Sequence, residues 1–486
     1  MTAETPVDSP QAPPDLTFPL ELRRAMIAMM LGGILVMLDS TIVNIALHAL
    51  SADLNSPLTT IQWVVTAYTL AMAMVMPVSG WLAKRVGARR ITVAATAAFT
   101  LASLLCGIAQ TPGQLIAFRV LQGLAGGLMM PVGQMVMVRL AGPARLARVM
   151  AVTGLPMIMM PVIGPTLGGV LLEHASWEWI FLVNVPVGAL ATWLCVRMLP
   201  RDTAEDAGRL DVPGLILAAA GTVALTYGLA KAGEPGGAPV GVTTAVAGVV
   251  LLGLFVVRAL RVDRPLLDVR LFANRVFAAA SLINFCFGAA IFGGMILLPI
   301  YLQTVRHESA VATGLLLAPQ GLGAAAAMML SGRITERLGA GTTALLGGVI
   351  AMVTTLPFVF ITADVPYWLL DAGLFARGWG IGLSAMPAMT AAFRALDPAK
   401  VADATPQLNI VQRIGGSMGT AIFAVVLQQG LDDAGGSAAG QADAFGNAFV
   451  WAFGVTVVAV FPAVLLAVLE RRGRRQSLQG VPRGIL

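Results

Sequence analysis

The sequence predicts an all-α membrane protein in which two six-helix bundles and two inserted helices give fourteen transmembrane helices. Three observations support this fold. The chain is too apolar to fold in water, its apolar segments are long enough to cross a bilayer, and motifs of its first half recur in its second half at a nearly constant offset.

The composition excludes most soluble classes. Of 486 residues, 57% are hydrophobic and only 12% are charged, with a mean hydropathy of +0.82, whereas soluble domains carry about 25% charged residues. The net charge of +6 comes from short basic clusters between apolar segments, not from a basic stripe with interleaved aromatics. We therefore expect no nucleic-acid partner, and we take the clusters as topology signals.

The apolar segments supply the transmembrane helices. A helix needs about 20 mainly apolar residues to cross ~30 Å of hydrocarbon. The run after Arg23 and Arg24 is too long for a cleaved signal, so we interpret it as the first span. The predicted spans lie near residues 25–50, 60–83, 90–109, 113–138, 149–172, 179–199, 212–231, 239–258, 276–302, 310–332, 341–362, 366–393, 404–430 and 447–469.

The basic residues give these spans a direction. An even number of spans puts both termini on one side of the membrane. With both in the cytoplasm, 26 of the 31 Lys and Arg fall in inside loops or tails, two (Lys231 and Arg306) fall outside, and three lie within spans. This excess is what the positive-inside rule requires, so we expect a multi-pass protein of the cell inner (plasma) membrane with cytoplasmic termini.

An internal repeat fixes the domain organisation. The loop GWLAKRVGARR at 80–90 matches GRITERLGAG at 332–341, at an offset of 252 residues, and spans 4 and 5 match spans 12 and 13 at similar offsets. Because the offset covers eight helices, two must be inserted between bundles of six. The expected domains are a disordered cytoplasmic tail (1–22), an N-terminal six-helix bundle (23–200), two inserted helices with flanking loops (201–275), a C-terminal six-helix bundle (276–470) and a basic cytoplasmic tail (471–486).

These motifs resemble those of the major facilitator superfamily. LDSTIVNIALHAL (38–50) and WEWIFLVNVPVG (177–188) narrow the resemblance to its fourteen-helix drug:proton antiporters, of the EmrB and QacA type. It covers roughly residues 22–430 and implies the major facilitator fold and proton-coupled export. One departure is Lys84, where the family usually has an acid, which puts the usual acidic latch at this inner gate in doubt. The second copy has Glu336 at that position.

Two charged residues of the first half are candidates for proton coupling. Asp39 lies about fourteen residues into span 1 and Arg119 about six residues into span 4, which places both ~21 Å from the inner face. An ion pair there would offset part of its desolvation cost. We expect Asp39 to carry the proton, and the family resemblance implies that Arg119 assists. A fixed structural pair is the alternative.

Other polar residues within the spans are candidates for the substrate pathway. Arg377 is the repeat counterpart of Arg119, and span 13 is unusually polar. Asp371 could instead be solvated surface, and Arg413 could instead reach the cytoplasmic interface. The full set is Asn44, Gln122, Asp371, Arg377, Gln407, Asn409 and Arg413.

The glycine-rich motifs predict conformational elements. GPTLGG in span 5 should form a bent, tightly packed helix at the moving interface between the halves, and the resemblance marks it as an antiporter motif. Together with the two repeated loops, the candidates are Gly80, Lys84, Arg85, Gly87, Gly164, Pro165, Gly168, Gly169, Glu336 and Gly339.

No enzyme motif is present, and without a P-loop we expect an ion gradient to supply the energy. We expect no cofactor beyond the proton gradient and no metal site. The expected partners are a small-molecule substrate, protons and membrane lipid, and we expect a monomer. The favoured function is proton-coupled export of amphipathic or cationic drugs. The alternatives are a dedicated exporter or importer of a single metabolite, or a non-transporting receptor or lipid-handling protein.

Overall fold

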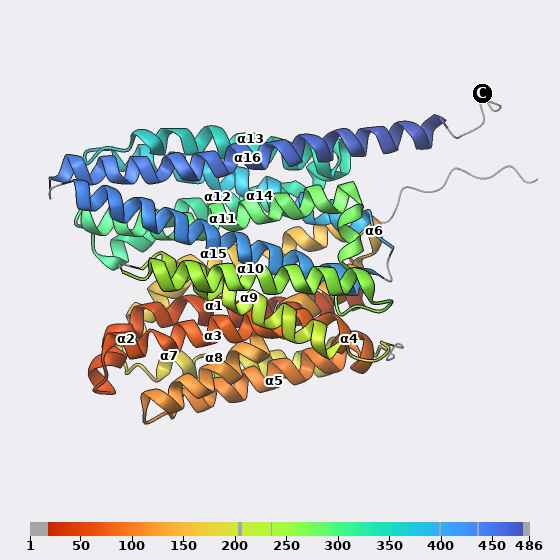
Figure 1. Cartoon of the computed structure of the whole chain (residues 1–486), viewed down its shortest axis with the longest axis horizontal. Coiled ribbons are helices and arrows are strands. Elements are labelled where there is room, and N and C mark those ends of the chain that lie inside the picture. The colour runs from red at the N-terminus through yellow and green to blue at the C-terminus, as the bar shows by residue number, and fades with distance from the viewer. Residues whose placement is uncertain (1–17, 203–206, 235, 398–399, 435–436, 480–486) are drawn as a thin grey trace, which may run out of the picture.

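The computed structural model describes residues 18–202, 207–234, 236–397, 400–434 and 437–479, and every regular element in these ranges is helical. The long helices run side by side (Figure 1). The elements are α1 (Leu20–Asp53), α2 (Leu58–Ile61), α3 (Trp63–Val75), η1 (Met76–Val78), α4 (Ser79–Val86), α5 (Ala88–Gly107), α6 (Pro112–His174), α7 (Trp179–Leu182), α8 (Asn184–Met198), α9 (Val212–Ala232), α10 (Ala238–Arg261), η2 (Val269–Ala273), α11 (Arg275–Thr304), α12 (Ala310–Leu338), α13 (Ala340–Thr355), η3 (Leu356–Phe360), α14 (Tyr367–Arg394), α15 (Val401–Asp433) and α16 (Ala438–Gln479).

Twelve helices within the described residues are long and apolar enough to cross a membrane. Two other predicted spans are helical but fall outside this set. One is α14, which carries Asp371 and Arg377. The other is the second part of α6, which follows Gly142, where φ is 64° and two helices meet. The structure therefore supports a multi-pass membrane protein, and the count of fourteen crossings stays a prediction.

The helices form two halves with separate interiors. In the N-terminal half (α1–α8), α6 packs against α1, α3 and α5. In the C-terminal half (α11–α16), α11 packs against α15 and α12 against α14. Phe99 and Phe181 fill the first interior, and Tyr301, Phe423 and Phe445 fill the second. The halves meet where α6 contacts α12, α14 and α15.

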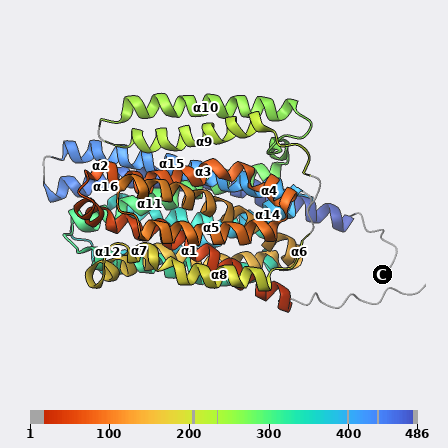
Figure 2. The same cartoon turned by 90° about the horizontal axis from the view of Figure 1, so that it is seen from below.

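The inserted pair lies at one side of this interface rather than between the halves. Helix α9 packs against α10 and also contacts α3 and α15, one helix from each half. Trp63 of α3 stacks on Tyr227 of α9, with ring centroids 6.0 Å apart. Helix α10 is outermost (Figure 2). The pair therefore covers one edge of the interface between the halves.

The start of α1 and the end of α16 lie at the same end of the bundle (Figure 2). We call this the basic end, because it carries Lys84, Arg85, Arg337, Arg471 and Arg472 near the ends of α4, α12 and α16. Helix α15 begins there. An even number of crossings would place both termini at one end in this way.

Candidate functional site

Asp39 and Arg119 form a buried ion pair inside the N-terminal half. Arg119 Nη1 lies 2.5 Å from Asp39 Oδ2, and the two side chains are 1% and 0% exposed. Asp39 comes from the middle of α1, and Arg119 from the first part of α6. The equal depth predicted from the sequence therefore corresponds to direct contact.

The Asp39 carboxylate has two further donors, one from α6 and one from α8. Gln122 Nε2 and Asn184 Nδ2 donate to Asp39 Oδ1 over 2.9 and 3.0 Å. Both amides also donate to Ser103 Oγ, which in turn donates to the carbonyl of Phe181. Helices α1, α6 and α8 thus meet at one carboxylate, whose two oxygens both accept hydrogen bonds, and α5 joins the cluster through Ser103.

The Arg119 guanidinium is equally well partnered. Its Nε donates to the carbonyl of Val64 over 3.0 Å, and its Nη1 also donates to Gln122 Oε1 over 2.7 Å. The guanidinium carbon lies 3.9 Å from the ring centroid of Tyr68 on α3, within range for a cation–π contact. A proton on Asp39 would neutralise the carboxylate and remove the attraction that holds this cluster together.

The C-terminal half does not repeat this arrangement. Arg377 is 1% exposed, and its Nη2 donates to the carbonyl of Ala290 over 3.3 Å. Its Nη1 has no partner among the described residues, and no carboxylate is paired with it there. Asp371 lies near the start of the same helix, six residues before Arg377, and its buried Oδ1 also has no described partner. Arg377 thus matches Arg119 in the repeat but not in its contacts.

Helix α15 presents polar side chains across the interface between the halves. Asn409 Nδ2 donates to Gln134 Oε1 of α6 over 2.8 Å. Arg413, one turn further along, contacts Met72 of α3, with Nη2 3.6 Å from Sδ. Gln407 instead donates to the carbonyl of Asp403 on its own helix and to that of Asp268, in the segment that follows the inserted pair. This contact favours a position of Arg413 away from the cytoplasmic interface, because Met72 lies near the middle of the membrane-length segment Leu58–Val86.

Two ion pairs join the halves at the basic end. Lys84 Nζ lies 2.8 Å from Asp403 at the start of α15, and Arg148 Nη2 lies 3.2 Å from Glu336 at the end of α12. Lys84 and Glu336 are repeat counterparts, 252 residues apart, and their partners are 255 residues apart. Asp403 on the facing helix supplies the acid that the first loop motif lacks at Lys84. The pair is present with its charges exchanged.

The glycines of the two loop motifs allow these close contacts. A Cβ on Gly80 would lie 2.3 Å from the carbonyl oxygen of Ala402, and one on Gly332 would lie 3.0 Å from Cγ of Arg148. Gly87 and Gly339 have φ of 98° and 91°, a conformation that favours glycine. Arg85 is exposed. The repeated motif therefore builds a matching contact twice at the basic end.

The GPTLGG motif contacts both halves: two of its glycines pack against α1, and Oγ1 of Thr166 lies 3.8 Å from the Cβ position of Gly314 on α12 of the other half. A Cβ on Gly164 would lie 2.1 Å from Thr41 Oγ1, and one on Gly168 would lie 2.9 Å from Ile42 Cγ1, so both glycines face α1. A Cβ on Gly169 would meet nothing within 4 Å. The side chain of Pro165 lies outside the described residues. Earlier in α6, Gly154 also faces the other half, beside Met328.

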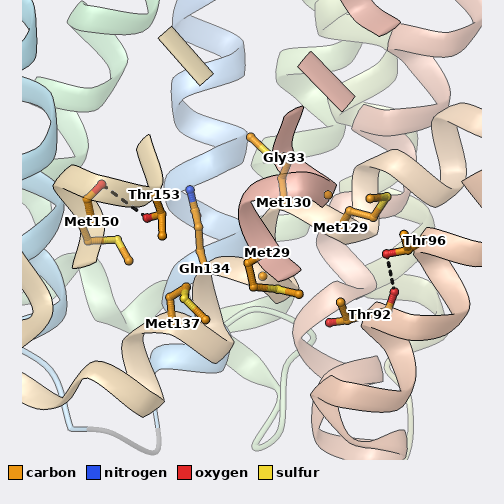
Figure 3. Close-up of a pocket in the computed structure, with 12 residues that line it drawn as sticks. Met29, Gly33, Thr92, Thr96, Met129, Met130, Gln134, Met137, Met150 and Thr153 are labelled. Carbon is orange, nitrogen blue, oxygen red and sulfur yellow. Dashed lines mark hydrogen bonds between the residues drawn. The ribbon is translucent and has the colours of Figure 1, made fainter. Parts of the chain in front are cut away.

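A small cavity of about 40 Å³ lies in the same half, between α1, α5 and α6 (Figure 3). It has no charged lining residue among those described. Gln134, which accepts the hydrogen bond from Asn409, is its most polar side chain. Its lining consists of Met29, Gly32, Gly33, Thr92, Thr96, Met129, Met130, Gly133, Gln134, Met137, Met150 and Thr153. The flexible thioethers give it an adaptable apolar surface.

The two remaining candidates for the substrate pathway, Gln122 and Asn44, lie in different surroundings. Gln122 lies at the centre of the Asp39 cluster, whereas Asn44 is exposed and, among the described residues, bonds through its side chain only to the carbonyl of Ser40 on its own helix. Reasoning from the sequence missed Asn184, Ser103 and Tyr68. A signal for Asn184 existed, because it is a polar residue inside the apolar motif at 177–188.

Comparisons with known proteins identify the family and the fold. The model of the Major Facilitator Superfamily matches residues 29–420. A relative from Mycobacterium tuberculosis named multidrug resistance protein B homolog is 39% identical over 402 residues, which cover 82% of this chain and 74% of the relative. Puromycin resistance protein pur8 of Streptomyces alboniger is 34% identical over 415 residues (82% and 81%).

A third relative covers more of the chain. The putative multidrug resistance protein MdtD of Cronobacter sakazakii is 32% identical over 437 residues, which cover 88% of this chain and 91% of the relative. Among solved structures, the human organic anion transporter MFSD10 has a TM-score of 0.65 and 15% identity, and the match covers 92% of this chain and 100% of that chain. At that identity, the likeness concerns the fold alone.

Proposed function

Since the chain belongs to the Major Facilitator Superfamily of membrane transporters, we propose that it is a proton-coupled exporter of amphipathic or cationic drugs, of the fourteen-helix drug:proton antiporter branch. It is a transporter of small molecules and not an enzyme. The observation that carries the proposal is the buried Asp39–Arg119 pair. Ionisable residues at membrane depth are costly, and they mark proton and substrate pathways.

The coupling residue in this proposal is Asp39. As a carboxylate, it accepts from Arg119, Gln122 and Asn184, and so ties α1 to α6 and α8. When Asp39 takes a proton from outside, its pairing with Arg119 weakens and these helices can move. When the site faces inward, the proton leaves and the pair forms again. Each cycle would exchange inward proton movement for outward substrate movement.

The gate in this proposal is the basic end, which we assign to the cytoplasm because basic residues concentrate on that side of membrane proteins. The pairs Lys84–Asp403 and Arg148–Glu336 hold it closed. The side chains of the first pair are each 21% exposed, so solvent screens it and each exchange of state can break it at modest cost.

The proposed antiporter branch also implies a number of membrane crossings and a side for the termini. We propose fourteen crossings, with six in residues 23–200, two in 201–275 and six in 276–470, in the inner membrane and with both termini in the cytoplasm. The position of α9 beside both α3 and α15 supports an inserted pair that covers the edge of the interface rather than forming the pathway.

The substrate class rests on the names of relatives. Three of them carry multidrug or puromycin resistance in their names, and the methionine-lined cavity offers apolar side chains of the kind that suits varied amphipathic compounds. Puromycin, an amphipathic amine, is the first compound to test.

The experiment is a resistance and accumulation screen in an efflux-deficient bacterial host. The wild-type chain should raise the inhibitory concentration of puromycin or of several cationic dyes, and Asp39→Asn should return it to that of the empty vector. Asp432→Asn is the matched control, because Asp432 is an exposed acid whose side chain, among the described residues, bonds only to Gln428. If no compound's accumulation changes with the wild-type chain, the drug-export proposal fails.

A further inference from the structure

We propose that Arg413 binds an anionic group of the substrate, such as a carboxylate, sulfonate or phosphate, at the interface between the two halves. This inference rests on the proposed function and names one chemical feature of the compounds that the pathway accepts. It begins from a cation in the membrane interior that has no counter-charge among the described residues.

The contacts of Arg413 leave its charge uncompensated. Its Nη2 reaches only the thioether of Met72, at 3.6 Å, and its buried Nη1 has no partner among the described residues. No ion pair is formed by Arg413 in that part of the chain. A buried cation without an anion is costly, and neutral thioether contact offsets little of that cost.

Arg119, unlike Arg413, has partners for its guanidinium on several sides. It has a carboxylate, an amide oxygen, a backbone carbonyl and an aromatic face. Arg119 and Arg413 lie in different halves, and of these two only Arg119 has an acid beside it among the described residues. Asp39 cannot serve both, because its two oxygens already accept from Arg119, Gln122 and Asn184.

The position of Arg413 suits a ligand better than a structural partner. It faces α3 of the other half, and Met72 lies one turn from Tyr68, whose ring stacks on Arg119. An anion at Arg413 would therefore lie near the proton-coupling cluster. Arg377, by contrast, points into its own half, where its Nη2 meets the carbonyl of Ala290 on α11.

The methionine-rich cavity of the N-terminal half lies close to the face of α15 that carries Arg413. Asn409 precedes Arg413 by one helical turn, about 6 Å, and bonds to Gln134, which lines the methionine-rich cavity (Figure 3). When the halves separate, this contact opens, and an apolar ring system could enter beside Gln134 while its anionic group bonds to Arg413. The geometry thus favours amphipathic compounds that carry an acidic group, including zwitterions.

The test compares two probes that differ only in one anionic group. 8-Anilino-1-naphthalenesulfonate has a sulfonate, and N-phenyl-1-naphthylamine lacks it. Binding to the full chain in nanodiscs is measured by equilibrium dialysis, with protein-free nanodiscs subtracted. Arg413→Gln should lower the affinity for the sulfonate about tenfold, as loss of a charge-assisted hydrogen bond does, and change that for the amine less than about twofold. Arg413→Lys should retain most of the sulfonate affinity.

A second variant protects the test against a folding defect at Arg413. Met72→Glu places a carboxylate beside the intact guanidinium and should block the sulfonate but not the amine, and Met72→Gln should weaken the sulfonate less. Lys231→Gln, an exposed basic residue paired with Glu234, controls for net charge and should change neither affinity. The assignment is overturned if the wild-type chain binds no sulfonate saturably, or if Arg413→Gln affects both probes equally or neither. Because no proton gradient is used, failure here is distinct from failure of proton-coupled export.

Discussion

Lys84 and Asp403 join the two halves at the basic end, with the ammonium 2.8 Å from both carboxylate oxygens. The matching pair, Arg148 and Glu336, has the opposite polarity, with the acid on the loop motif and the base on the facing helix. Both sites thus have an ion pair between a loop motif and a facing helix, although the charge on the loop is positive at one site and negative at the other.

Exchange of the charges at the first pair should therefore be tolerated. Lys84→Asp and Asp403→Lys should each reduce puromycin efflux several-fold, because each puts like charges together. The double variant should recover efflux to within about twofold of wild type, since the pair is only modestly stabilising and partly exposed. Recovery no better than that of the worse single variant would contradict a role for the pair.

The same two positions report whether the basic end opens during transport. Lys84→Cys with Asp403→Cys, joined by a short bifunctional methanethiosulfonate, should stop efflux, and a reductant should restore it. The native Cys106, Cys195 and Cys286 are buried, so the wild-type background should give no cross-link. Efflux that continues in fully cross-linked protein would show that this end need not open.

Arg119 and Arg377, counterparts in the repeat, should respond oppositely to the same substitution. Arg119→Met leaves Asp39 buried without its cation and should destabilise the protein by about 3–5 kcal/mol. Arg377→Met removes a 1% exposed cation that has no described counter-charge, and it should leave stability unchanged or raised. Thermal unfolding in nanodiscs checks this. Equal destabilisation by both would mean that Arg377 has an anionic partner.

The glycines of GPTLGG should differ in their tolerance of a side chain. Gly164→Leu should abolish efflux while expression is retained, since even a Cβ there would lie 2.1 Å from Thr41 Oγ1. Gly169→Ala should leave efflux unchanged, because nothing lies within 4 Å of its Cβ position. Thr41→Ala should partly rescue Gly164→Ala by removing the nearest atom. Loss of efflux in Gly169→Ala would place the critical contact elsewhere.

Several of these features could be predicted from the sequence. Hydropathy along the chain predicted the helical segments, whereas the direction that the charge distribution assigns to them stays a prediction. The depth of Asp39 and Arg119 along their helices was enough to predict that they meet. These predictions succeed because each depends on position along one helix, which a fixed rise per residue determines.

Features that depend on helix rotation could not be predicted. The faces of the second part of α6 decide that Gly164 and Gly168 meet α1 rather than the other half. The partner of Lys84 lies 319 residues away in the chain, and Asn184 joins the Asp39 cluster from a third helix. Contacts between helices distant in sequence depend on how the helices are turned, and hydropathy along one helix does not report that.

The central claim is that Asp39 couples substrate export to proton movement. The most direct measurement uses proteoliposomes that enclose a pH-sensitive dye, with puromycin as the driving gradient and equal pH on both sides. The wild-type chain should move protons against the direction of puromycin flow, and Asp39→Asn should abolish proton movement while the protein stays folded and inserted. Puromycin-driven proton movement at the wild-type rate in Asp39→Asn would contradict the account.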